Sequence, residues 1–191
     1  MNLKLKDIAT ISVGLLLNRK KASSKDKDKF NYKVISLKDF NDDAVYNHEF
    51  AENFIANEDL TQYLAQKGDI LVRLREPNFA IYIDKDYPNL IYSSLVAKIR
   101  VKNFNPLFIA HYLNSSVVKR RLLKDISGTS IPTINIKNLE NINIPKISLQ
   151  KQEYLVKCLQ EFRKNNQILK NLITQNKKVQ KFIIENLEQG I

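Results

Sequence analysis

The sequence predicts an α/β (α+β) globular domain followed by one long C-terminal helix that forms an antiparallel coiled coil in a dimer. Short β-prone runs alternate with helical segments over residues 1–147, and 43% of the 191 residues are hydrophobic, enough to form a core. Apolar residues then recur at spacings of three and four towards the C-terminus. We therefore expect a globular domain at residues 1–147 and the helix at residues 148–191, joined by a short linker.

Strands are predicted from β-prone runs that are separated mainly by glycine, proline, asparagine and aspartate. The first of them stops at Gly14. In chain order the expected strands are Thr10–Val13, Tyr32–Leu37, Glu52–Ile55, Ile70–Arg75, Phe79–Ile83, Leu90–Tyr92, Leu95–Val101 and Asn141–Ile144.

Short helices are predicted where a capping residue precedes an apolar run. Asn57 can cap a helix that extends to Leu64, and Asn105 followed by Pro106 places a proline at the first helical position. Asn135 can cap a turn through Leu139. The remaining helices are expected at Leu5–Ala9, Leu107–Leu113 and Val117–Lys124.

The long helix is predicted from Ser148, which can cap its first turn, to Gln189. About 40 residues at 1.5 Å each extend roughly 60 Å, farther than a domain of this size can cover, so the helix needs a partner. Positions that alternate by four and three form the seam of a coiled coil. They are Leu155, Leu159, Phe162, Asn166, Leu169, Ile173, Asn176, Gln180, Ile183 and Leu187.

The polar seam positions are compatible with an antiparallel second copy. If the two-fold axis lies near Asn171, Asn166 faces Asn176 and Leu169 faces Ile173. An unpaired buried amide costs about 1–3 kcal/mol, which favours this register over its neighbours. A parallel pair also matches asparagine with asparagine, and a long helix packed on its own domain is a further alternative. The seam by itself therefore indicates association and leaves the orientation open.

The net charge of +11 favours nucleic acid or another polyanion as partner, although many basic proteins owe their charge to solubility alone. The segment Arg19–Lys29 contains six basic residues and is expected to be a solvated loop. Its Lys20, Lys21 and Lys25, with Arg120 of the basic helix, are candidate phosphate contacts. The alternative is that these charges are ordinary solvated surface.

Two further segments are candidates for contacts with bases. Arg73 and Arg75 are expected on one side of a strand, where guanidinium groups can bind guanine or phosphate in bidentate fashion. Thr129 and Ser130 belong to a polar loop that can present hydroxyl groups to an anion or to base edges. The alternatives are an ion pair with Glu76 for the arginines and an ordinary loop between helices for the hydroxyls.

No catalytic residue, metal site or cofactor site is predicted. His48 and His111 lie in unrelated segments, Cys158 has no second cysteine, and Gly-rich phosphate loops are absent. The N-terminal residues lack the apolar core of a signal peptide, and no run reaches the 18 apolar residues of a membrane span. We expect a cytoplasmic protein without a membrane partner.

The order of several short motifs resembles the specificity (S) subunit of type I restriction-modification systems. The motifs cover nearly the whole chain and precede a long helix, as in that family. The chain departs at Lys151, where the family usually has glutamate. The matching segments are residues 5–14, 67–72, 93–99, 128–134 and 144–152.

The resemblance implies a non-catalytic DNA-recognition subunit with a single target recognition domain, half of the usual two. Family members join two such domains through two long antiparallel helices, so that a homodimer of this chain would read an interrupted, palindromic target. The implied partners are double-stranded DNA, an adenine methyltransferase subunit and a translocating endonuclease subunit.

Two other classes of function stay open from the residues. One is a protein-interaction adaptor, in which the basic domain binds an acidic protein and the helix dimerises. The other is a stand-alone nuclease that would require a metal ion.

Overall fold

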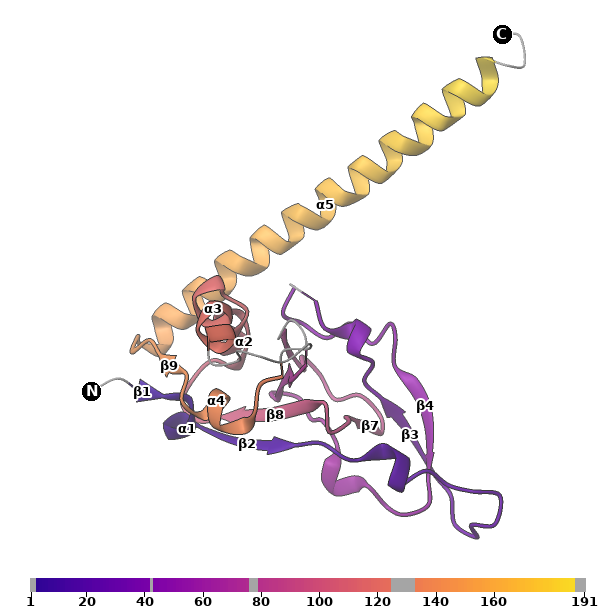
Figure 1. Ribbon diagram of the computed structural model, residues 1–191. Coiled ribbons are helices and arrows are strands. Elements are labelled where there is room, and N and C mark those ends of the chain that lie inside the picture. The colour runs from indigo at the N-terminus through magenta and orange to yellow at the C-terminus, as the bar shows by residue number, and fades with distance from the viewer. Residues whose placement is uncertain (1–2, 42, 76–78, 125–132, 188–191) are drawn as a thin grey trace. The chain divides into compact units, whose positions relative to one another are not determined.

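The computed structural model describes residues 3–41, 43–75, 79–124 and 133–187. The chain forms two compact units, Met1–Gln152 and Glu153–Ile191. The first is a mixed α/β unit, and the second consists of helix α5 (Leu149–Leu187) from its second turn onward. This confirms the predicted fold class of an α/β domain followed by one long helix (Figure 1).

A four-stranded antiparallel sheet is the larger of the two main sheets of the first unit. Its order is β2-β8-β5-β6. The strands are β2 (Ala9–Val13), β5 (Ile70–Arg73), β6 (Ala80–Tyr82) and β8 (Val96–Val101), and the one-turn helix α1 (Leu5–Ile8) leads into β2. Because neighbouring strands run in opposite directions, β2 and β5 end where β6 and β8 begin.

A second sheet of three strands has the order β4-β3-β7. Strands β3 (Phe30–Val34) and β4 (Glu52–Ala56) form an antiparallel pair, and β7 (Leu90–Ile91) runs parallel to β3. Three 3-10 turns complete this region. They are η1 (Leu17–Arg19), η2 (Leu37–Asp39) and η3 (Thr61–Tyr63).

The predicted helix from Asn57 to Leu64 is wrong, because only η3 forms there. The carboxylate of Asp59 accepts hydrogen bonds from the backbone amide of Thr61 and from the Tyr32 hydroxyl, both at 2.9 Å. These local bonds compete with a helix. Leu64 is extended and bridges to Ile91, so the segment lies against the second sheet instead of continuing as a helix.

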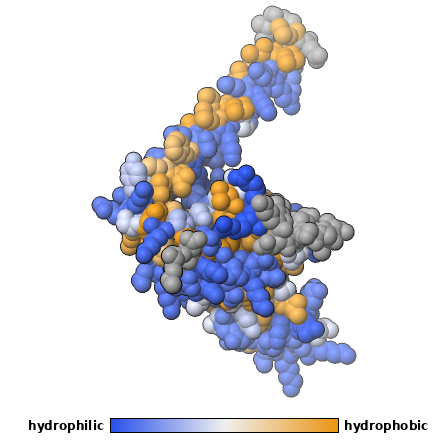
Figure 2. Space-filling model, turned by 60° about the vertical axis from the view of Figure 1, so that its left-hand side comes forward, coloured by the Kyte–Doolittle hydropathy of each residue, from blue (hydrophilic) through white to orange (hydrophobic). Residues whose placement is uncertain are grey.

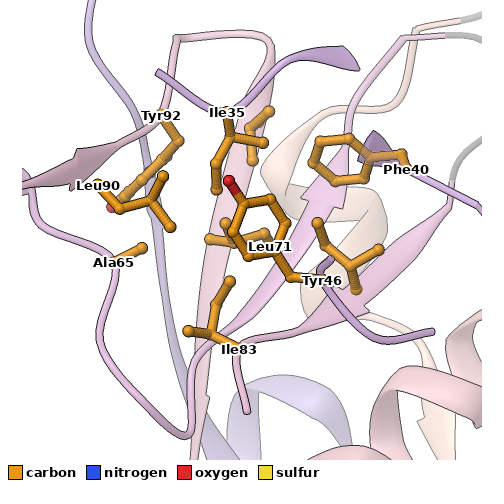
Figure 3. Packing of buried hydrophobic residues seen from close by; sticks show 10 residues of the cluster. Ile35, Phe40, Tyr46, Ala65, Leu71, Ile83, Leu90 and Tyr92 are labelled. Carbon is orange, nitrogen blue, oxygen red and sulfur yellow. The ribbon is translucent and has the colours of Figure 1, made fainter. Parts of the chain in front are cut away.

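The main hydrophobic core joins the four-stranded sheet to β7 and to the segments that follow β3 (Figure 3). From the four-stranded sheet come Leu71 of β5 and Ile83, which directly follows β6. From the second sheet come Leu90 of β7 and Tyr92, which directly follows β7. The hydroxyl of the buried Tyr46 is hydrogen-bonded to Nδ1 of His48 at 2.9 Å. Burial raises the pKa of Tyr46 far above its usual value, so this phenol stays neutral.

Helix α2 (Pro106–Leu113) begins as predicted, with Pro106 at its first position and the Asn105 side chain accepting from the Phe108 amide. Helix α3 (Ser116–Lys124) follows directly. Asn135 caps the short helix α4 (Ile136–Glu140). Strand β9 (Asn143–Ile144) then pairs with β1 (Leu3–Lys4), which fastens the two ends of the globular unit together.

The first turn of α5 is fixed within the globular unit by Gln152, which is 1% exposed. Its side-chain oxygen accepts from the Asn105 amide at 2.9 Å, and its side-chain nitrogen donates to the Ile147 carbonyl at 3.1 Å. Ser148 accepts from the Lys151 amide at 3.3 Å, as the predicted cap requires.

Replacing Asn114 with alanine is expected to lower the free energy of unfolding by about 2–4 kcal/mol. Its side chain closes a ring with Ala80 of β6, accepting from the amide at 2.7 Å and donating to the carbonyl at 2.8 Å. Ala80 is fully buried, so both backbone groups would lose their partners without gaining water. Chemical denaturation measures the change.

Asn53→Ala is the matched control, because Asn53 is exposed on β4. We expect this change to alter stability by less than about 0.5 kcal/mol. Equal losses for the two variants would contradict the role given to Asn114.

Candidate nucleic-acid interface

Residues distant in sequence meet at the end of the four-stranded sheet where β2 and β5 stop and β6 and β8 start. Arg73 pairs with Val96 and Val13 with Ala97 in the strand register. The Leu74 amide donates to the Leu95 carbonyl at 2.9 Å. We call this region the sheet end. It comprises residues 13–19, 73–75, 79, 93–95 and 133.

The predicted strand Ile70–Arg75 ends two residues early, at Arg73. The backbone of Leu74 turns to two new partners, since its amide bonds to Leu95 and its carbonyl accepts from Ile134 at 2.8 Å. Arg75 then forms an antiparallel bridge with Thr133. The expectation that one regular strand carries both arginines is therefore wrong, although both belong to the sheet end.

Arg73 carries an unusual buried donor. Its side chain is partly buried, and its Nε atom is buried without a hydrogen-bond partner among the described residues. A buried guanidinium N–H without an acceptor is energetically costly and therefore uncommon in a folded protein. Arg75 is exposed. The sheet end thus contains two guanidinium groups, one partly buried at Arg73 and one exposed at Arg75.

A third cation, Lys119, contacts Phe79, the residue whose carbonyl accepts from the Arg73 amide. The Arg73 amide donates to the Phe79 carbonyl, and the Lys119 ammonium group lies 3.7 Å from the centre of the Phe79 ring. Sequence reasoning missed this pair, because it depends on the docking of α2 and α3 beside β6 through Asn114. Arg120, the predicted residue of the same helix, is exposed, and its Nε donates to the Ser116 carbonyl at 3.2 Å.

The predicted basic loop Arg19–Lys29 is only partly a solvated loop. Lys20 pairs with Glu58 at 2.6 Å, and Lys21 bridges to Ala56 at the edge of β4. Exposed residues dominate from Ser23 onward, and Lys25 is among them. Of the three predicted phosphate contacts here, Lys20 therefore has a carboxylate partner already, whereas Lys21 and Lys25 present exposed side chains.

Two predicted residues, Thr129 and Ser130, lie outside the described residues. The described chain resumes at Thr133, which bridges to Arg75 at the sheet end. No set of three or more His, Cys, Asp or Glu side chains suited to a metal ion occurs in the described ranges. Likewise, no described helix is long and apolar enough to cross a membrane.

Helix α5 exposes more apolar surface than a single seam needs. Within the predicted seam, Phe162, Leu169, Ile173, Ile183 and Leu187 are each more than half exposed, and Leu159 is 37% exposed. A second row of exposed apolar side chains directly precedes seam positions in the sequence, and we call it the second stripe. It consists of Tyr154, Ile168, Leu172, Val179 and Phe182.

The seam and the second stripe lie side by side, because successive residues of a helix differ by about 100°. Figure 2 shows hydrophobic residues continuing along α5. A coiled coil with one partner covers mainly one seam. The width of the apolar surface on α5 therefore fits contact with more than one helix.

A family model described as "Type I restriction modification DNA specificity domain" matches residues 1–178. The chain belongs to this family. The match spans the globular unit and most of α5, and it confirms the resemblance found from the short motifs. No curated protein matches the chain.

Solved structures of type I systems share the fold. The HsdS subunit from Thermoanaerobacter tengcongensis is 18% identical with a TM-score of 0.60, covering 90% of this chain and 39% of that one. The S subunit from M. genitalium is 18% identical with a TM-score of 0.56, and the match covers 93% of this chain and 42% of that one. A chain from a study of complex assembly and conformational transition of the type I R-M system is also 18% identical, with a TM-score of 0.61. The match covers 90% of this chain and 40% of that one. This chain thus spans about two-fifths of each.

Proposed function

We propose that this chain is the non-catalytic DNA-recognition subunit of a type I restriction-modification system. It reads an interrupted, palindromic target as a homodimer and directs a methyltransferase subunit and an endonuclease subunit to it. The observation that carries the proposal is the sheet end, which contains Arg73 and Arg75 and whose Phe79 contacts Lys119, on a chain of net charge +11. Membership of the DNA specificity family supports it.

Within this proposal the predicted site residues divide into two roles. Lys20, Lys21, Lys25 and Arg120 contact phosphates and set the position of the domain on the duplex. Arg73, Arg75, Thr129 and Ser130 contact bases. Either arginine can contact a base through its terminal nitrogens, because guanine offers two acceptors to one guanidinium group.

Helix α5 has separate roles for its two apolar rows. The seam pairs with a second copy of α5 in the antiparallel register, which places Leu169 against Ile173 and Asn166 against Asn176. The second stripe then receives a helix of the methyltransferase subunit. Leu172 of the second stripe and Ile173 of the seam are each 55% exposed, which supports a separate helix partner for each row.

The proposed division is a target recognition domain at residues 1–147 and a dimerisation, spacer and docking helix at 148–191. Two domains at opposite ends of paired helices would read two half-sites at a fixed separation. The hydrogen bonds of the buried Gln152 support such coupling, because they fix the first turn of α5 within the globular unit.

Affinity selection from random duplexes tests the function. We expect the selected sequences to share two inverted half-sites separated by a gap of constant length. Selection without any consensus would contradict the proposal and favour the adaptor function. Cleavage by the chain alone with a divalent metal would favour the nuclease.

Arg73→Ala is expected to weaken binding to the selected target by about 1–3 kcal/mol while leaving random duplex binding nearly unchanged. The reason is that a base contact contributes only on the correct sequence. Fluorescence anisotropy on both duplexes measures the two affinities. Arg163→Ala, which removes the same charge from α5, is the control and should affect both little. Equal losses on both duplexes for Arg73→Ala would make it a phosphate contact.

A further inference from the structure

The sheet end contains a surface hollow that the predicted site residues do not touch. Its volume is about 410 Å³, and its walls come from the segment after β2 and the turn between β7 and β8. Leu16 is 54% exposed and Leu95 is 37% exposed. The lining residues are Leu15, Leu16, Leu17, Asn18, Arg19, Ser93, Ser94 and Leu95.

The walls of the hollow are held by backbone hydrogen bonds between the two segments. The Leu15 amide donates to the Tyr92 carbonyl at 3.2 Å, and the Ser94 amide donates to the Leu15 carbonyl at 2.7 Å. Gly14 makes this approach possible, because a Cβ atom there would lie 2.4 Å from the carbonyl oxygens of Tyr92 and Ser93. The hollow is therefore built into the fold, with little adjustment left to its backbone.

The lining side chains match the chemistry of base edges in the major groove. Serine and asparagine hydroxyl and amide groups bond to base acceptors and donors, arginine binds guanine, and apolar side chains contact the methyl group of thymine. None of the eight described lining residues is acidic, and Arg19 adds a positive charge. Leu16 and Leu95 give the hollow an apolar surface that a ligand with an apolar edge can cover.

We propose that this hollow reads an A·T base pair of the half-site, with the thymine C5-methyl group against Leu16 and Leu95. Asn18, Ser93 and Ser94 supply hydrogen bonds to the same or the neighbouring pair. The inference rests on the proposed function, and it adds a group of specificity-determining residues separate from Arg73 and Arg75. DNA is favoured as the occupant for two reasons. Leu95 of the hollow is hydrogen-bonded to Leu74, the neighbour of Arg73, and the basic loop starts at Arg19, which also lines the hollow.

Uracil substitution tests the methyl contact on the intact chain. Each thymine of the selected target is replaced in turn by uracil, which removes one methyl group and keeps every hydrogen bond. At one position per half-site we expect the affinity to fall about fourfold, the effect of one buried methyl group. Leu16→Ala and Leu95→Ala should bind the thymine and uracil duplexes equally well.

Ile55→Ala is the control, because Ile55 is an exposed apolar residue of β4 outside the hollow. It should retain the preference for thymine. Unchanged affinity for uracil at every position would overturn the inference, and so would a preference for thymine that survives in both leucine variants. A selection without any consensus would instead reject the proposed function, so the two failures are distinguishable. The wild-type uracil series needs no variant, so it can overturn the inference even if a leucine variant misfolds.

Discussion

Leu169→Lys is expected to separate the two copies of the chain and to abolish tight binding to the bipartite target. In the proposed register Leu169 lies near the centre of the seam opposite Ile173, and each dimer contains this contact twice. Each buried leucine contributes about 1.5–3 kcal/mol, so losing both should raise the dimer dissociation constant by about 10² to 10⁴-fold. Analytical ultracentrifugation at micromolar concentration measures it.

Binding to DNA should change together with the dimer. A monomer holds a single half-site, whereas the dimer gains effective concentration at the second half-site. The variant should therefore bind the full target no better than a duplex with one half-site. Anisotropy on the two duplexes provides this comparison.

Gln167→Lys is the matched control, since Gln167 precedes Leu169 by two residues and lies about 200° around the helix. It should stay dimeric. Leu172→Lys, in the second stripe, should also stay dimeric but lose the methyltransferase subunit in a pull-down. A Leu169→Lys chain that remained a dimer would reject the proposed seam.

Gly14→Ala is expected to destabilise the globular unit by more than about 3 kcal/mol. The added methyl group would lie 2.4 Å from two carbonyl oxygens and 2.6 Å from Cδ2 of Tyr92. The carbonyls cannot retreat freely, because Tyr92 accepts from the Leu15 amide and the Gly14 amide itself donates to Val96. Thermal unfolding should show a decrease in Tm of about 10 °C for a unit of this size.

Gly68→Ala gives the comparison that separates steric overlap from backbone strain. Gly68 has a φ of +94°, but no atom lies within 4 Å of the added Cβ. Its substitution should cost only the strain of a left-handed residue, about 1–2 kcal/mol. If Gly14→Ala were no more destabilising than Gly68→Ala, the close approach at Tyr92 would not limit stability.

Local signals in the sequence were sufficient for elements that depend on their own residues. The heptad spacing predicted α5, and Asn105 with Pro106 predicted the start of α2, because capping and helical periodicity act within a few residues. The same reasoning failed at Asn57–Leu64, where Asp59 bonds to Thr61 and Leu64 extends towards Ile91. A contact with a distant strand prevailed over a local preference for helix.

The sequence by itself determined the α/β class, the long helix, the positive charge and the motif order that identifies the family. Tertiary structure decided what shares the sheet end. Phe79 meets both the Arg73 amide and the Lys119 ammonium group because Asn114 docks α2 on β6, and the hollow joins residues 15–19 to residues 93–95. The physical reason is that antiparallel pairing of β2 with β8 brings together residues 84 to 92 positions apart, and no local preference encodes which strands pair.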